Sequence, residues 1–137
     1  MTRLFLDTSY AIALAAPSDR LHRQAQELWV EIERTRMRII TTRAVLLEIG
    51  NALSKPKQRK IAAELLGSLD RDSRVDVVPL SEELYQRGLE LFRRRPDKGW
   101  GLVDCISFEV MREHAVNDSL TSDGHFEQAG FRALLRA

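Results

Sequence analysis

The sequence predicts an α/β fold: a three-layer α/β/α domain built around a parallel sheet. Short apolar runs alternate along the chain with longer segments in which apolar residues recur at helical spacing. The short runs are mainly apolar instead of alternating regularly with polar residues, which is typical of strands buried on both faces. A chain of 137 residues has room for one such domain, so we expect residues 1–137 to form a single domain.

Five short segments are predicted to be strands, each bounded by turn residues or by the start of a helical pattern. They are residues 3–7, 38–41, 75–78, 119–121 and 131–135. Pro79 ends the third of them, and Gly130 separates the last from a preceding helical turn. Strands separated in this way by helices favour parallel pairing.

Helices are predicted in the intervals between these strands. After Asp19, a suitable N-cap residue, apolar residues recur at helical spacing as far as Arg36. Ser81, followed by Glu82 and Glu83, likewise predicts the start of a helix. The expected helices are residues 8–15, 19–36, 43–54, a segment marked by Ile61, Leu65 and Leu69, a segment from Ser81 to Phe92, residues 102–114 and a turn at 124–129.

Composition indicates a globular cytoplasmic protein. The hydrophobic fraction is 44%, and no apolar run approaches the roughly 20 residues of a membrane span or the apolar core of a signal peptide. The single cysteine, Cys105, excludes an intramolecular disulfide and a multi-cysteine metal site. Because Cys105 lies in an apolar helical run, we interpret it as a core residue, with a catalytic thiol as the alternative.

Four carboxylates stand where a chain rarely places one for structural reasons alone: Asp7, Glu48, Asp104 and Asp123. Asp7 and Asp123 follow strands, Asp104 opens a helix, and Glu48 lies inside the apolar run VLLEIGNAL. An ionised carboxylate in apolar surroundings is costly unless it is paired or bound to a metal. Ligands of parallel sheets also collect at the carboxyl ends of the strands. We therefore expect the four carboxylates to form one metal-binding cluster.

Each of these residues also has a structural alternative. Asp7 and Asp104 could cap or begin helices, and Asp123 could be a turn residue. Glu48 could lie on a solvated face of its helix. Asn51, three residues further on, could orient Glu48 or simply be exposed.

The residue types favour Mg²⁺ or Mn²⁺ over zinc, because these hard ions prefer oxygen ligands. The three histidines, His22, His114 and His125, are too dispersed for a ligand pattern, and we interpret them as surface or packing residues. A divalent ion held by carboxylates activates water and stabilises charge on phosphoryl oxygens. This is the chemistry of phosphodiester hydrolysis.

Charge is consistent with a polyanionic substrate. The formal net charge is +1, so the chain outside the four carboxylates carries +5. Two local clusters, Lys55, Lys57, Arg59 and Lys60 and the arginines at 93–95, could contact nucleic acid or could be solvated helix ends. Trp100 could stack on a base or anchor its own loop.

Four segments together resemble the PIN domain family, and within it the VapC-type toxins of bacterial and archaeal toxin–antitoxin pairs. They are LFLDTSY, EIGNAL from Glu48, VDCISFEVM around Asp104, and LTSDGHFEQAGF near the C-terminus. The resemblance implies a five-stranded parallel sheet, a site for Mg²⁺ or Mn²⁺ and ribonuclease activity. By motif position, Asp7, Glu48, Asp104 and Asp123 would be the acidic set.

The resemblance further implies a homodimer and a small antitoxin that covers the active site. Val103 departs from the family pattern, because many relatives carry Ser or Thr at this position. Asp97 lies in the loop before the helix predicted at 102–114, where relatives often carry an acid. A catalytically weak RNA-binding or complex-forming PIN domain is the alternative function. A receiver-like switch with Asp7 as phosphoacceptor is disfavoured, because the late strand–loop region lacks the lysine that such a switch needs.

Overall fold

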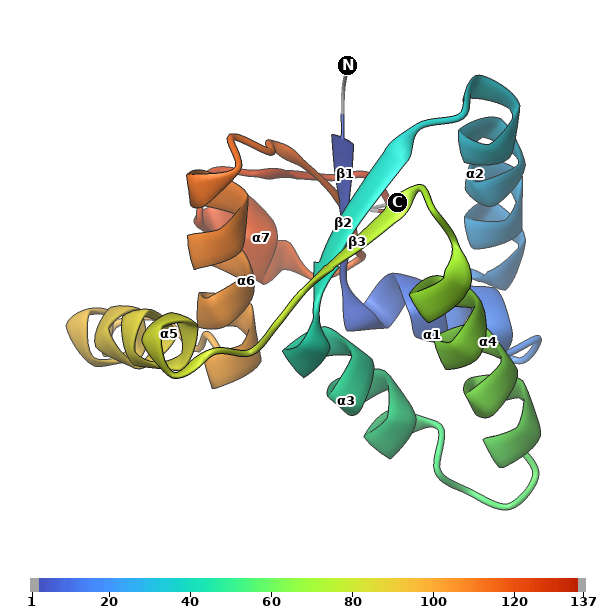
Figure 1. Ribbon diagram of the computed structural model, residues 1–137, viewed down its shortest axis with the longest axis horizontal. Helices are drawn as coiled ribbons and strands as arrows, with labels where there is room; N and C mark the ends of the chain where they lie inside the picture. The colour runs from blue at the N-terminus through green and yellow to red at the C-terminus, as the bar shows by residue number, and fades with distance from the viewer. Residues whose placement is uncertain (1–2, 136–137) are drawn as a thin grey trace.

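The computed structural model describes residues 3–135 and has a central sheet between two layers of helices (Figure 1). The strands are β1 (Arg3–Leu6), β2 (Arg38–Thr42), β3 (Val75–Val78), β4 (Asp118–Leu120) and β5 (Arg132–Ala133). They pair in parallel in the order β3-β2-β1-β4-β5. The predicted three-layer fold with a five-stranded parallel sheet is therefore confirmed.

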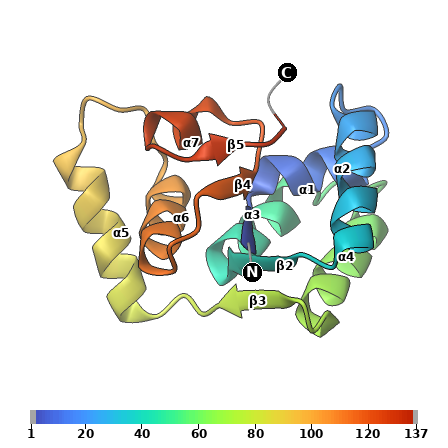
Figure 2. The same ribbon diagram turned by 90° about the horizontal axis from the view of Figure 1, so that it is seen from above.

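The helices cover both faces of this sheet. They are α1 (Thr8–Ala15), α2 (His22–Thr35), α3 (Arg43–Ala52), α4 (Arg59–Arg71), α5 (Glu82–Arg94), α6 (Leu102–Glu113) and α7 (Gly124–Gln128). Seen from above, α5 and α6 lie on one side of the strands, and α2 and α4 lie on the other (Figure 2). Among the helices of residues 3–135, none has the length and apolarity that crossing a membrane requires.

Most element boundaries fall within two residues of the prediction, but α2 begins three residues later than expected. The Asp19 carboxylate accepts the backbone N–H of Leu21 at 2.9 Å, and the Asp19 carbonyl accepts the N–H of His22 at 3.0 Å. Asp19 thus closes a turn before the helix instead of capping it. At α3 the cap is Thr42, whose hydroxyl accepts the N–H of Val45 at 3.1 Å.

The strand order places a switch point at β1. The chain leaves β1 for β2 on one side and later returns to β4 on the other, so the space beyond the carboxyl ends of β1 and β4 is open to a ligand. Asp7 immediately follows β1, and its backbone N–H donates to the Leu120 carbonyl at the end of β4, at 3.1 Å. This bond fixes the first acidic residue against the neighbouring strand.

An aromatic cluster around Phe108 fixes α6, α7 and the loop between α5 and α6. The Phe108 ring centroid lies 5.0 Å from that of Trp100, 4.9 Å from that of Phe126 and 5.7 Å from that of Phe131. Trp100 is 5% exposed, and its indole N–H donates to Gln128 Oε1 at 3.1 Å. Trp100 therefore anchors its loop, and a base cannot stack on this buried ring.

Cys105 is fully buried in α6, as the core interpretation predicts. Burial raises the pKa of its thiol to about 11, so the thiol is protonated near neutral pH. This environment disfavours the alternative of a catalytic thiolate.

Candidate metal centre

An open pocket of about 400 Å³ lies at the switch point of the sheet, and all four predicted carboxylates line it. Its walls come from the N-terminal ends of α1, α6 and α7 and from the middle of α3. The lining residues are Asp7, Thr8, Ser9, Ile12, Glu48, Gly101, Leu102, Val103, Asp104, Asp123 and His125. Four separate elements thus each bring one acid to the same pocket.

Asp7 is the most buried of the acids, at 4% exposure. It occupies the N-cap position of α1, yet its Oδ2 accepts hydrogen bonds from Thr121 Oγ1 at 2.7 Å and from Ser9 Oγ at 3.2 Å. Burial raises the pKa of Asp7 to about 6, the hydrogen bond from Thr121 lowers it, and the charge of Asp104 raises it again. Without a cation, Asp7 is therefore harder to ionise than an exposed aspartate.

The Asp104 and Asp123 carboxylates both accept hydrogen bonds from backbone N–H groups near the starts of their helices. Asp104 Oδ2 accepts the N–H of Gly101 at 3.2 Å, and Asp123 Oδ1 accepts the N–H of His125 at 2.9 Å. Each cap engages one oxygen, and an ionised carboxylate has two. Burial, and to a lesser extent the charge of Asp123, raises the pKa of Asp104. Capping and metal binding are thus compatible at both residues.

His125 is the pocket residue that sequence reasoning missed. Its Nδ1 lies 3.0 Å from Asp104 Oδ2 and 3.4 Å from Asp123 Oδ1. One ligand atom from each of these three residues falls within 4.8 Å of the others. The interpretation of His125 as a surface or packing residue is therefore wrong. Its position two residues after Asp123, at a helix start, is the local signal that places it here.

Glu48 reaches the pocket from an exposed face of α3. Leu46 and Ile49 are buried, whereas Glu48 and Leu47 are exposed, with Leu47 at 59%. The expectation that Glu48 is enclosed by apolar neighbours is wrong, because the helical period turns it outward. The Thr8 hydroxyl donates to Glu48 Oε1 and so ties α1 to α3 across the pocket.

Neither Asn51 nor Asp97 is among the residues that line the acidic pocket. Asn51 is exposed and lines a different pocket with Ser54 and Arg59. Asp97 is held by Arg95 at 2.9 and 3.0 Å, and this hydrogen-bonded pairing lowers the pKa of Asp97 to about 2. Asp97 is thus satisfied by a neighbour in its own loop.

Val103 does line the pocket, so a hydroxyl is missing from this part of the wall. Hydroxyls at other positions surround Asp7 instead. Ser9 Oγ and Thr121 Oγ1 lie 3.0 Å apart, and Thr121 Oγ1 also accepts the N–H of Asp123 at 3.0 Å. This small network holds the start of α1 and the end of β4 in a fixed relation.

The donor set fits a hard divalent ion. Four carboxylates offer oxygen ligands. The charge of Asp104 contributes to the raised pKa of Asp7, and the charge of Asp123 contributes to the raised pKa of Asp104. A cation placed among them removes that repulsion, and Mg²⁺ and Mn²⁺ are the ions that prefer such ligands.

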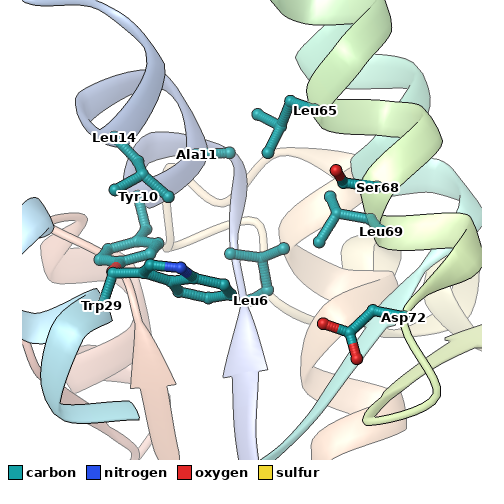
Figure 3. A pocket seen from close by; sticks show the side chains of 9 residues that line it. All are labelled: Leu6, Tyr10, Ala11, Leu14, Trp29, Leu65, Ser68, Leu69 and Asp72. Atoms are coloured by element: carbon teal, nitrogen blue, oxygen red, sulfur yellow. The ribbon is translucent and has the colours of Figure 1, made fainter. Parts of the chain in front are cut away.

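A second pocket, of about 170 Å³, has a different character (Figure 3). Leu6, Tyr10 and Trp29 are among its mostly apolar lining residues, and the Tyr10 hydroxyl donates to the Ala25 carbonyl at 2.8 Å. Asp72 is the one carboxylate of its lining, and its Oδ1 accepts the N–H of Arg74 at 2.9 Å. This pocket lacks the groups that phosphate chemistry needs.

Comparisons with known proteins place the chain among proteins of this fold. A family model described as PIN domain matches residues 4–132. Over 128 residues the chain is 28% identical to a protein described as 23S rRNA-specific endonuclease VapC20 in two strains of Mycobacterium tuberculosis, covering 93% of this chain and 95% of the relative. The crystal structure of Mycobacterium tuberculosis VapC20, described as a sarcin–ricin loop cleaving toxin, matches with a TM-score of 0.84 at 26% identity. It covers 93% of this chain and 95% of the matched chain.

Proposed function

Because the chain belongs to the PIN domain family, we propose that it is a metal-dependent endoribonuclease that acts as the toxin of a toxin–antitoxin pair. The observation that carries this proposal is the pocket at the switch point, where Asp7, Glu48, Asp104 and Asp123 converge from four elements. The similarity to an RNA endonuclease over 93% of the chain supports RNA as the substrate.

Asp7, Glu48, Asp104 and Asp123 would hold one or more Mg²⁺ or Mn²⁺ ions. Such an ion supplies activation of the attacking water and stabilisation of charge on the phosphoryl oxygens. Thr121 and Ser9 fix the Asp7 carboxylate through Oδ2. Such supporting hydrogen bonds commonly determine metal affinity nearly as strongly as the ligands themselves.

His125 and Thr8 would orient the remaining acids. The His125 ring bridges Asp104 and Asp123, and the Thr8 hydroxyl holds Glu48. Four carboxylates repel a phosphodiester, so cations in the pocket favour the entry of RNA by compensating this charge. Metal binding thus assists substrate entry as well as catalysis.

The partners proposed for this chain follow from the same family membership. They are an RNA substrate, a small antitoxin protein and a second copy of the chain in a homodimer, all in the cytoplasm. The Mycobacterium tuberculosis relative is described as a 23S rRNA-specific endonuclease and as a sarcin–ricin loop cleaving toxin, so the sarcin–ricin loop is the first candidate RNA.

The test compares Asp104→Asn with Asp97→Asn on a panel of structured RNAs that includes a sarcin–ricin hairpin. Both variants remove one carboxylate charge, but only Asp104 lines the pocket. Asp104→Asn keeps a capping oxygen and should lower cleavage at saturating RNA by at least about 100-fold, the upper end of what even supporting residues cost. Asp97→Asn should cleave at close to the wild-type rate, and chelation should abolish cleavage by all three proteins.

Near wild-type cleavage by Asp104→Asn would contradict the assignment of these carboxylates. Wild-type protein that binds the RNA panel in Mn²⁺ but cleaves none of it would instead support the alternative of an RNA-binding module.

A further inference from the structure

The connection from α3 to α4 is the most concentrated positive segment of the chain. Between residues 49 and 63 the sequence has four cations, Lys55, Lys57, Arg59 and Lys60, and no acid. All four side chains belong to exposed residues, and three of the four lysines of the chain are among them. We call residues 53–60 the basic hairpin.

The cations of the basic hairpin lack the acidic partners that arginines elsewhere have. Arg43 pairs with Asp70 at 3.1 Å, and Arg74 pairs with Glu33 at 3.1 Å. Within residues 3–135, by contrast, no carboxylate lies within 4.0 Å of a charged nitrogen of the four hairpin cations. Arg59 donates only to the carbonyl of Ser54, at 3.0 Å. Their charge is therefore available to an external anion.

A pocket of about 560 Å³ opens between α3 and α4 beside this charge. Asn51, Ser54, Arg59 and Lys60 supply cationic and hydrogen-bonding groups to its lining, and Leu53 belongs to its apolar part. The volume lies in the range of ligand pockets. Cations and amides beside an apolar surface suit a nucleotide, whose phosphate is charged and whose sugar and base are largely apolar on their faces.

Helix α3 joins this pocket to the acidic one. Glu48 lines the acidic pocket and Asn51 lines the basic one, and three residues of helix rise about 4.5 Å. Figure 1 shows α3 running from the end of the sheet toward the α3–α4 connection. A strand of RNA with its reacting phosphate at the acids and its backbone running along α3 would bring flanking phosphates toward the hairpin.

We propose that the basic hairpin and the pocket beside it bind the RNA backbone that flanks the cleaved bond. This assignment rests on the proposed function and adds to it the surface that captures the substrate. Lysine and arginine neutralise phosphates without reading sequence, so the hairpin supplies affinity and register while the acids supply chemistry. RNA is favoured over an acidic protein because the proposed substrate of the adjoining pocket, one helical turn away, is itself RNA.

The test measures binding of a fluorescently labelled RNA hairpin by anisotropy, in EDTA, over a range of salt concentrations. Four proteins are compared: wild type, Lys57→Ala/Lys60→Ala, Lys57→Arg/Lys60→Arg and Arg34→Ala/Arg38→Ala. The last variant also removes two positive charges, from exposed Arg34 at the end of α2 and from partly buried Arg38 at the start of β2. These sites lie at the opposite ends of the strands from the acidic pocket. Initial cleavage rates in Mn²⁺ are measured in parallel.

Loss of two phosphate contacts should reduce the slope of log K against log salt by about 1.4 and weaken binding about 25-fold at roughly 0.1 M salt. The arginine variant should restore both values, and the control pair should stay within about twofold of wild type. At saturating RNA, Lys57→Ala/Lys60→Ala should cleave at the wild-type rate.

Equal affinity and slope for Lys57→Ala/Lys60→Ala and the control pair would overturn the proposal in favour of an acidic protein partner. If wild type nevertheless cleaves RNA, only the hairpin assignment fails. If wild type neither binds nor cleaves any RNA, the hairpin assignment and the proposed function fail together.

Discussion

Replacing Asp7 by Asn should stabilise the metal-free protein at neutral pH. Asp7 is 4% exposed, and burial raises its pKa from 3.8 to about 6. Because the folded state binds this proton more tightly than the unfolded state, the stability of the fold is greatest below about pH 3.8. It falls as the pH rises toward 6. At pH 7 the ionised carboxylate thus costs roughly 3 kcal/mol relative to its protonated form.

The measured gain should be smaller than this cost. Asn keeps an oxygen that can accept from Thr121, but its new amide hydrogens need acceptors, which costs about 1–2 kcal/mol. We therefore expect a net gain of about 1–2 kcal/mol at pH 7, which for a domain of this size raises Tm by roughly 3–8 °C. Near pH 4 Asp7 is already protonated in the folded protein, so only the cost of the amide hydrogens remains and the gain should turn into a loss of about 1 kcal/mol.

The assay is thermal unfolding followed by circular dichroism in EDTA at several pH values between 4 and 7.5. Asp97→Asn is the matched control, because it makes the same chemical change at an exposed carboxylate whose pKa its hydrogen-bonded pairing with Arg95 lowers to about 2. This control should show no rise in Tm. Added Mn²⁺ should raise the Tm of wild type and of Asp97→Asn more than that of Asp7→Asn.

Two results would refute the reasoning. A lower Tm for Asp7→Asn than for wild type at pH 7 in EDTA would mean that the carboxylate stabilises the empty pocket. A difference between the two proteins that stays constant from pH 7 to pH 4 would mean that ionisation of Asp7 is not its cause.

Two further substitutions test the packing and the hydrogen bonds that position the site. Gly88→Ala should destabilise the fold by about 1–3 kcal/mol in chemical denaturation, since a Cβ there would lie 2.5 Å from Ile106 Cγ1. Gly50→Ala, whose Cβ would meet its nearest neighbour at 3.6 Å, should be neutral or slightly stabilising, and similar losses for both would contradict the packing argument. Thr121→Val removes the buried 2.7 Å hydrogen bond to the first acid and should weaken Mn²⁺ binding about tenfold by calorimetry. The exposed Thr35→Val should not, and unchanged Mn²⁺ affinity for Thr121→Val would exclude that hydroxyl from the site's support.

The fold could be predicted from the sequence because its central strands are buried on both faces. Runs such as residues 3–6 and 38–41 lack the alternation of a half-exposed strand, and a helical pattern follows each of them. The start of α2 could not be predicted, because Asp19 suits both a helix cap and a turn before a helix. The path of the loop before Asp19 determines which of these two roles Asp19 has.

Only the candidate site residues that directly follow strands could be placed from the strand pattern alone. Asp7 and Asp123 follow strands, so a parallel sheet brings them to one edge. Asp104 and Glu48 lie on helices, and local periodicity does not say over which part of a sheet a helix packs. The resemblance to a family supplied that information. The support from Thr121 depends on a contact that spans 114 residues of sequence, which no local pattern encodes, whereas His125 could have been placed from its position two residues after Asp123.

Glu48 is exposed because of its position around helix α3, although the segment that contains it is apolar. Its neighbours in sequence are apolar, yet α3 buries Val45 and Ile49 and turns Glu48 toward the pocket. The Glu48 side chain is therefore exposed to solvent, whereas that of Asp7 is buried. Burial raises the pKa of Asp7, and a cation entering the pocket favours its ionised form. Metal affinity should thus rise with pH through the titration of Asp7, which links this buried acid to the pH dependence of metal binding.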